Sequence, residues 1–227
     1  MCGRYVLTHE ERALEAMLKV ALSFYLKPRY NIAPTQPIPI ARTDLDTKKR
    51  EIAYAYWGLI PSWTKDPSIG TKMINARAET LREKPSFRGL YKLKRCLIPA
   101  SGFYEWKQIV KGKKTPHYIK MLDDSLFAFA GLWDTYLDPG GAEVDTVTII
   151  TTKANEIVGE LHERMPVIVP REKYNQWLDA DNQTAKGLDS ILAPYPADEM
   201  TYYPVSTEVN SAARDEPSFI SPTSLFG

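Results

Sequence analysis

The residue with the most distinctive potential chemistry is Cys2, which follows Met1 at the start of the chain. If Met1 is removed, Cys2 carries a free α-amine and a thiol on adjacent carbons. Such a 1,2-aminothiol condenses with an aldehyde to a Schiff base, and the thiol then closes a five-membered thiazolidine ring. The α-amine of a model peptide has a pKa of about 7.7–8.0, so it is a competent nucleophile near neutral pH. Taken alone, this position favours the simpler interpretation that Cys2 merely follows the start codon.

Two further residues are candidates for proton transfer. Glu105 lies among large apolar neighbours in residues 102–106, and burial on a strand would raise the pKa of its carboxyl and suit it to acid–base catalysis. His162 shares one face of an extended segment with Arg164, a pairing suited to proton transfer and phosphate binding. The alternative interpretations are an exposed strand glutamate and a structural histidine.

Polar and stacking residues complete the set of candidates. Asn75 has the character of an N-cap at the start of a short helix, and Arg77 follows it as either a functional or a surface residue. Pro34 and Trp63 lie in expected loops, where prolines and aromatic rings can stack on bases or wedge between them. Burial in loop packing is the commoner fate of a tryptophan.

Composition excludes several classes of protein. With two cysteines and three histidines in 227 residues, the chain has neither a disulfide framework nor a zinc-ligand pattern. We therefore expect no metal and no cofactor. It has no apolar run long enough to span a bilayer and no secretion signal, so we expect a cytosolic or nuclear protein without membrane contact.

The charge is distributed unevenly along the chain although the net charge is only +1. Residues 82–120 contain 11 Lys/Arg and 2 Asp/Glu, a net charge of +9, whereas residues 121–227 have a net charge of −12. The central block is a candidate anion-binding surface, with a solvated basic loop as the alternative.

Hydrophobic patterning predicts one α+β domain over residues 1–227, with many short strands and a few helices. A capping-box pattern, Thr8-x-x-Glu11, precedes an amphipathic helix predicted over residues 9–20. Four prolines indicate an ordered loop over residues 28–39, and β-branched residues make 144–152 a strand. The tail from about residue 216 is expected to be irregular.

Six short motifs, in this order along the chain, resemble those of the SOS response-associated peptidase family of abasic-site DNA–protein crosslinking proteins. The resemblance runs from residue 2 to about residue 210 and covers nearly the whole chain. The motifs are Cys2-Gly3-Arg4-Tyr5, Tyr30-Asn31-Ile32-Ala33-Pro34, Trp57-Gly58-Leu59-Ile60-Pro61-Ser62-Trp63, Asn75-Ala76-Arg77-Ala78-Glu79-Thr80, Gly102-Phe103-Tyr104-Glu105-Trp106 and His162-Glu163-Arg164-Met165-Pro166. One departure is Thr64, where the family often has a second tryptophan.

The resemblance implies a single compact domain with a barrel-like mixed β core, short flanking helices and a basic DNA-binding groove. It implies that Cys2 crosslinks to the aldehyde of an abasic site in single-stranded DNA, with Asn75, Glu105 and His162 as the other catalytic residues. Arg4, Arg77 and Arg164 would contact phosphates, and Pro34 and Trp63 would stack on or separate the flanking bases. Autocatalytic removal of Met1 (a hydrolase reaction) and weak Schiff-base lyase chemistry are also implied.

The same resemblance implies a role in the SOS or DNA damage response. The partner would be single-stranded DNA containing abasic sites, with the replication machinery as a further candidate, and the protein would be a monomer. It would act in the bacterial cytoplasm at the nucleoid, or in a eukaryotic nucleus. Two alternatives remain open: a peptidase acting in trans with Cys2 as N-terminal nucleophile, and a non-enzymatic reader of damaged or modified DNA.

Overall fold

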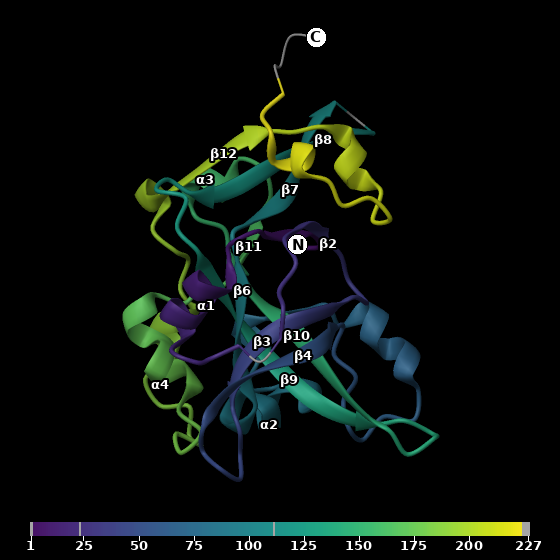
Figure 1. The fold of residues 1–227 in the computed structure, drawn as a ribbon, viewed down its shortest axis with the longest axis vertical. Helices are drawn as coiled ribbons and strands as arrows, with labels where there is room; N and C mark the ends of the chain where they lie inside the picture. Colours follow the sequence, from purple (N-terminus) through teal and green to yellow (C-terminus); the bar gives the residue numbers. More distant parts are fainter. Residues whose placement is uncertain (1, 23, 111, 224–227) are drawn as a thin grey trace.

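The centre of the fold is a ring of five strands that closes on itself (Figure 1). A computed structural model describes residues 2–22, 24–110 and 112–223. The β4–β10 contact is parallel, and the other four contacts around the ring are antiparallel. In order around the ring, the strands are β10 (Glu143–Lys153), β4 (Arg50–Trp57), β3 (Pro37–Thr43), β6 (Arg95–Ala100) and β9 (Phe127–Leu137), which pairs again with β10. The expected barrel-like core of an α+β domain is confirmed.

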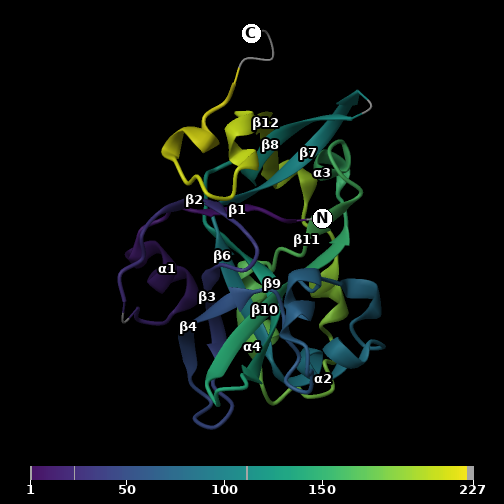
Figure 2. The same cartoon turned by 90° about the vertical axis from the view of Figure 1, so that its right-hand side faces the viewer.

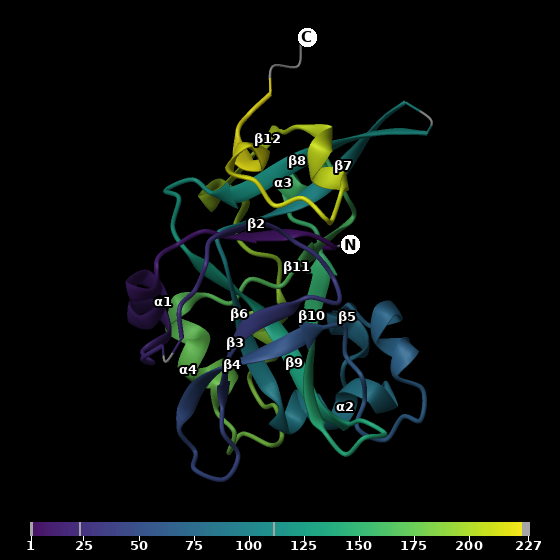
Figure 3. The same cartoon turned by 45° about the vertical axis from the view of Figure 1, so that its right-hand side comes forward.

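A second, open sheet of five strands lies at one end of the barrel (Figure 3). Only Ser101 separates β6 from the first residue of this sheet's strand β7, so the barrel wall continues directly into the sheet. In spatial order the strands are β12 (Met200–Pro204), β8 (Lys113–Met121), β7 (Gly102–Val110), β1 (Tyr5–Leu7) and β2 (Arg29–Ile32). The N-terminal strand β1 is thus held between two neighbours, which fixes the position of the residues just before it.

Two three-residue strands attach to the same end of β10, as the labels in Figure 3 show, and Figure 2 gives another view of one of them, β11 (Arg164–Pro166). Strand β5 (Asn75–Arg77) pairs in parallel with residues 149–151 of β10, and β11 (Arg164–Pro166) pairs antiparallel with residues 151–153. This pairing brings two distant segments, which carry the candidates Asn75 and His162, to one end of one strand.

The helices are short: α1 (Glu11–Leu18), α2 (Pro85–Leu93) and α4 (Tyr174–Leu178) lie around the barrel, whereas α3 (Glu156–Gly159) lies beside β11 and β12, next to the second sheet. Within the described residues, no helix is long and apolar enough to cross a bilayer. The helix predicted over 9–20 is confirmed in a shorter form, but the predicted capping box is wrong. Glu10 occupies the N-cap without a side-chain bond, because the Thr8 hydroxyl lies 3.3 Å from the Ser101 hydroxyl instead.

Two other local predictions are wrong because long-range pairing overrides local preference. Asn75 is not an N-cap: it lies in β5, opposite Ile149, and the following 3₁₀ turn starts at Ala78. The expected loop over 28–39 contains strands, since Arg29–Ile32 forms β2 beside β1 and Pro37 begins β3.

The C-terminal segment covers the outer face of the second sheet. Val209 and Phe219 are fully buried in a cluster that also contains Val6, Tyr104 and Tyr118 of β1, β7 and β8. Within the tail expected to be irregular from about residue 216, Pro217–Ile220 forms a 3₁₀ turn. The segment therefore contributes to the core that supports β1.

We expect Phe219→Ala to destabilise the whole domain. Removing a fully buried phenyl ring leaves a cavity in the small cluster behind β1, and such truncations cost about 3–5 kcal/mol. Denaturant unfolding followed by far-UV circular dichroism measures the loss, with Leu122→Ala, at a side chain 57% exposed, as the control. A change below 1 kcal/mol for Phe219→Ala would show that the segment only rests on the sheet.

Candidate active site

Cys2 is fully buried, three residues before β1 begins at Tyr5. The antiparallel pairing of β1 with β7 places Tyr5 opposite Phe103, and the Tyr104 N–H donates to the Arg4 carbonyl. Burial raises the pKa of the Cys2 thiol, and the nearby charge of Glu105 raises it further. The thiol is therefore protonated at neutral pH.

Glu105 lies in β7 with only 3% of its surface exposed, in the position expected of a buried strand carboxyl. Burial raises the pKa of Glu105. Across the ladder it lies opposite His117 of β8, which is itself buried and whose Nδ1 lies 3.0 Å from the Thr115 carbonyl. A carboxyl with a raised pKa keeps its proton to higher pH than an ordinary glutamate and can pass it to a neighbour.

Asn75 reaches across from β5 to the N-terminal segment. Its Nδ2 donates to the Cys2 carbonyl at 2.8 Å. Its Oδ1 is buried and accepts no hydrogen bond from the described residues. The amide therefore fixes the Cys2 backbone and leaves an acceptor beside it, which can receive a proton-bearing group of a reactant.

We expect Asn75→Ala to slow the reaction of Cys2 without unfolding the protein. The change removes one hydrogen bond, worth about 1 kcal/mol of stability, but it also releases the backbone that orients the nucleophile. A rate decrease of about 10- to 100-fold, measured with an aldehyde-bearing substrate, is the expected result. Asn155→Ala, which removes a helix-capping amide away from Cys2, is the control for a purely structural effect.

His162 lies between α3 and β11, and local bonds fix its ring. The Arg164 backbone N–H donates to His162 Nδ1 at 3.0 Å, which leaves the proton of a neutral ring on Nε2. Burial lowers the pKa of His162, so the neutral form predominates near pH 7. Two residues earlier, Glu160 accepts a hydrogen bond from the Tyr202 hydroxyl at 2.7 Å and so ties this turn to β12.

Arg164 is held by the protein itself. Its guanidinium forms a two-pronged ion pair with Glu79, at 2.6 and 2.9 Å, and donates to the Thr151 carbonyl at 2.7 Å. Its Nε is buried and makes no hydrogen bond to the described residues. Sequence reasoning missed the role of Glu79, which no local pattern reveals because its partner lies 85 residues away.

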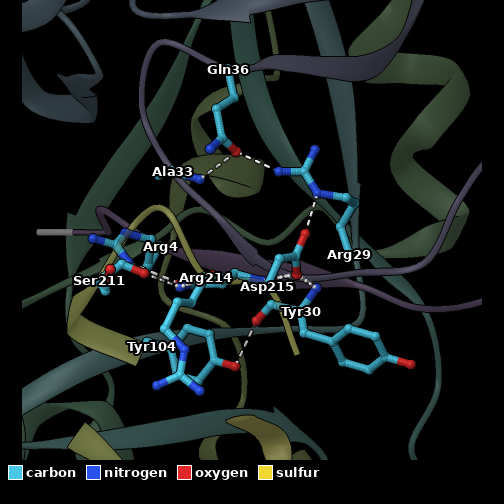
Figure 4. Close-up of polar contacts among 10 residues, drawn as sticks. Arg4, Arg29, Tyr30, Ala33, Gln36, Tyr104, Ser211, Arg214 and Asp215 are labelled. Atoms are coloured by element: carbon cyan, nitrogen blue, oxygen red, sulfur yellow. Dashed lines mark hydrogen bonds and ion pairs between the residues drawn. The ribbon is translucent and has the colours of Figure 1, made fainter. Parts of the chain in front are cut away.

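Arg4 is also engaged within the protein (Figure 4). Its guanidinium donates to Asn31 Oδ1 at 2.9 Å, to the Val209 carbonyl at 2.7 Å and to the Asn210 carbonyl at 3.3 Å. Asn31 is fully buried and its amide donates to carbonyls of the same C-terminal segment. Arg4 therefore anchors β1, and a phosphate contact would have to use its remaining N–H groups.

Asp215 also binds the C-terminal segment to the N-terminal strands (Figure 4). Its carboxylate accepts hydrogen bonds from the backbone N–H groups of Tyr30 and Asn31 and forms an ion pair with Arg29 at 2.5 Å. Arg29 also donates to the side-chain oxygen Oε1 of Gln36, and the same oxygen accepts a hydrogen bond from the Ala33 N–H at 3.1 Å. These bonds set the shape of the turn that carries Pro34.

The remaining predicted DNA contacts lie on the surface. Trp63 is 64% exposed, Pro34 is partly buried in a turn beside Trp57, and Arg77 is exposed at the end of β5. The loop of Trp63 is fixed because the Ser62 N–H donates to the buried Asp134 at 2.8 Å. The surface position of Trp63 differs from the usual burial of tryptophan and suits stacking.

Much of the basic block is neutralised in space. Arg82 pairs with Asp189 at 3.0 Å, Lys94 with Asp134 at 2.7 Å and Lys107 with Glu160 at 3.8 Å. Arg95 is buried and donates to backbone carbonyls. The net charge of this stretch therefore overstates the basic surface that it offers.

Comparison with known proteins identifies the family. The model of the SOS response associated peptidase (SRAP) family matches residues 1–212. The abasic site processing protein YoqW of Bacillus subtilis is 44% identical over 223 residues, which cover 97% of this chain and 99% of that protein. The abasic site processing protein HMCES of Gallus gallus is 36% identical over 88% of this chain and 67% of its own length. A crystal structure of a protein from Bacteroides thetaiotaomicron superposes with a TM-score of 0.86 at 27% identity, covering 98% of this chain and all of that one. The chain belongs to the SOS response associated peptidase family.

Proposed function

We propose that this protein processes abasic sites in single-stranded DNA by forming a covalent thiazolidine crosslink through Cys2 after Met1 is removed. The observation that carries the proposal is the convergence on Cys2 of two polar residues from separate strands. Asn75 binds its carbonyl, and Glu105 lies on the neighbouring strand, close enough for its charge to raise the pKa of the thiol. The names of the relatives supply the substrate class.

The reaction proceeds in two balanced steps. The neutral α-amine of Cys2 attacks the aldehyde carbon of the ring-opened sugar, and loss of one water gives an imine. The Cys2 thiol then adds across the C=N bond, so that sulfur binds carbon and the thiol proton passes to nitrogen. Ring closure is favoured because thiol and imine belong to one residue and meet at high effective concentration.

Glu105 is suited to move the protons in these steps. Its raised pKa lets it donate a proton to the departing water and then accept one from the thiol. Neutral His162, oriented by the Arg164 backbone, assists opening of the sugar by transferring a proton at its hydroxyl. Asn75 orients Cys2 throughout.

The surface residues would position the strand. Arg77 and the remaining N–H groups of Arg4 and Arg164 would contact phosphates, and Pro34 and Trp63 would hold the flanking bases apart. These contacts would recognise the phosphates of the DNA strand and the missing base between two stacked neighbours, so binding would be independent of the surrounding DNA sequence. A single strand suits this mode because its bases are accessible.

Two further activities belong to the same proposal. Met1 removal is a hydrolysis at the bond preceding Cys2, and Glu105, whose charge acts on Cys2, would activate water for it. An imine that fails to close can lose the 3′ phosphate by β-elimination, which is weak lyase chemistry. Closure of the thiazolidine diverts this intermediate into a stored adduct that shields the lesion.

Intact mass spectrometry tests the proposal. We expect the purified protein to lack the mass of Met1, and we expect incubation with an abasic single-stranded oligonucleotide to add the mass of the DNA less one water. The same oligonucleotide with its aldehyde reduced to an alcohol is the control and should leave the protein unchanged. Absence of any adduct from protein that has lost Met1 would refute the crosslinking function.

A further inference from the structure

The hairpin formed by β7 and β8 projects beyond the sheet as a free two-stranded ribbon (Figure 3). Strand β1 pairs with β7 only at residues 102–103, and β12 pairs with β8 only at residues 117–121. In the described part of the hairpin beyond residue 106, the two strands therefore pair only with each other. An isolated two-stranded ribbon gains little stability from its own contacts. The extension of the hairpin beyond the sheet therefore adds little to the stability of the fold, and a role in binding would account for it.

The end of this ribbon combines apolar and basic side chains. Ile109 and Val110 are 54% and 57% exposed, among the most exposed large hydrophobic residues of the described chain. Lys113 and Lys114 are exposed and form no salt bridge with the described residues, in contrast to Arg82 and Lys94 in the same basic block. Residues 106–122 contain five lysines and no Asp or Glu. The tip therefore complements a polyanion that also offers apolar surface.

The ribbon is also connected to the candidate active site. Strand β7 runs from Glu105 to the tip, and at about 3.3 Å per residue the tip lies roughly 17 Å away along the strand. Burial raises the pKa of Glu105 and lowers that of His162, and the charge of Lys114 acts to lower both. Lys114 thus lies where its charge reaches both residues.

We propose that the β7–β8 hairpin is a nucleic-acid-binding arm, in which Lys113 and Lys114 contact the phosphates of the strand and Ile109 and Val110 pack against its bases. The inference rests on the proposed function for the identity of the ligand, single-stranded DNA. The charge supports a nucleic acid as occupant, because a partner protein would need an acidic surface with an apolar centre. Any single-stranded nucleic acid combines the two features, because its unpaired bases present apolar faces and its phosphates supply the negative charge.

Salt-dependent binding tests the two lysines. The probe is a single-stranded oligonucleotide with a tetrahydrofuran abasic analogue, which cannot form an imine, and fluorescence anisotropy measures its affinity at several salt concentrations. In the variant Lys113→Ala/Lys114→Ala, we expect the slope of log affinity against log salt to decrease by about 1.4, since each phosphate contact to a single strand contributes about 0.7. The matched control is Lys48→Ala/Lys49→Ala in the turn between β3 and β4, at the opposite end of the molecule (Figure 1). Equal slopes for the hairpin variant and the wild type would overturn the proposal.

A second variant tests the apolar pair. We expect Ile109→Ser/Val110→Ser to weaken binding severalfold with an unchanged salt slope, because apolar contacts release no counterions. Sedimentation velocity of the wild type is the companion measurement. Concentration-dependent dimers that disappear in this variant would show instead that the tip binds a second copy.

The covalent reaction separates this inference from the proposed function. The Ile109→Ser/Val110→Ser variant should reach the full crosslink yield at saturating abasic DNA, because it alters neither Cys2, Asn75, Glu105 and His162 nor Lys114, whose charge reaches two of them. If the wild type forms no crosslink, the proposed function fails, while the anisotropy measurement still decides whether the hairpin binds DNA. If the crosslink forms and the slope does not change, only the hairpin proposal fails.

Discussion

We expect Cys2→Ser to abolish the heat-stable adduct with abasic single-stranded DNA. Serine retains the α-amine and can still form an imine, but its hydroxyl is a far weaker nucleophile toward the C=N bond than the Cys2 thiol. The open imine hydrolyses or undergoes β-elimination, so the variant should convert a crosslink into strand cleavage. Denaturing gel electrophoresis after heating measures both products, and a loss of adduct of at least 100-fold is expected.

Cys96→Ala provides the matched control. Cys96 is the other cysteine of the chain and is also fully buried, in β6 of the barrel wall, where burial raises the pKa of its thiol too. The two thiols differ in position: Cys96 is internal and has no α-amine to offer. Wild-type adduct levels in Cys2→Ser, or loss of the adduct in Cys96→Ala without unfolding, would contradict the assignment of Cys2.

The second large effect is expected for Glu105→Gln, which should lower the crosslinking rate while stabilising the fold. A glutamine at this site cannot transfer protons, and loss of a positioned acid–base group typically costs 10²–10⁴ in rate. The stability gain follows from the raised pKa of the buried carboxyl. Stopped assays of adduct formation measure the rate, and thermal unfolding over a pH series measures the stability.

The pH dependence has a definite sign. In the unfolded chain Glu105 ionises at its ordinary pKa, whereas in the fold burial keeps it protonated to higher pH. The native state therefore loses stability as pH rises from the unfolded pKa to the folded one. Glu105→Gln should match the wild type below the ordinary glutamate range and exceed it progressively above. Glu83→Gln, at an exposed site before α2, is the control for the loss of a surface carboxyl. An identical pH profile for Glu105→Gln and the wild type would contradict this assignment.

Local sequence patterns predicted the barrel strand over 144–152 well because this segment is buried and rich in β-branched residues. The predicted strand 144–152 is β10 almost residue for residue. The partners of each strand were not predictable, and this explains the error at Asn75. Its local context is that of an N-cap, but pairing with β10 makes it a strand residue that reaches Cys2.

The contacts of Arg4 and Arg164 were likewise not predictable from local sequence. Sequence placed Arg4 and Arg164 near the reactive residues, yet their roles depend on partners far along the chain. Arg4 meets carbonyls about 205 residues later, and Arg164 meets Glu79, 85 residues earlier. No periodicity or motif encodes such contacts, because they arise only when the two sheets are assembled.

The anchoring of Arg4 also has a consequence for the order of events during synthesis. The ribosome releases Cys2 first, but the carbonyls of Val209 and Asn210 that hold β1, and the Asp215 carboxylate that holds β2, emerge only about 200 residues later. Until then the nascent chain lacks the contacts that order its first strand. The surroundings of Cys2 are therefore complete only when translation of the domain is nearly finished, and in the proposed function this order would limit premature reaction of the N-terminus.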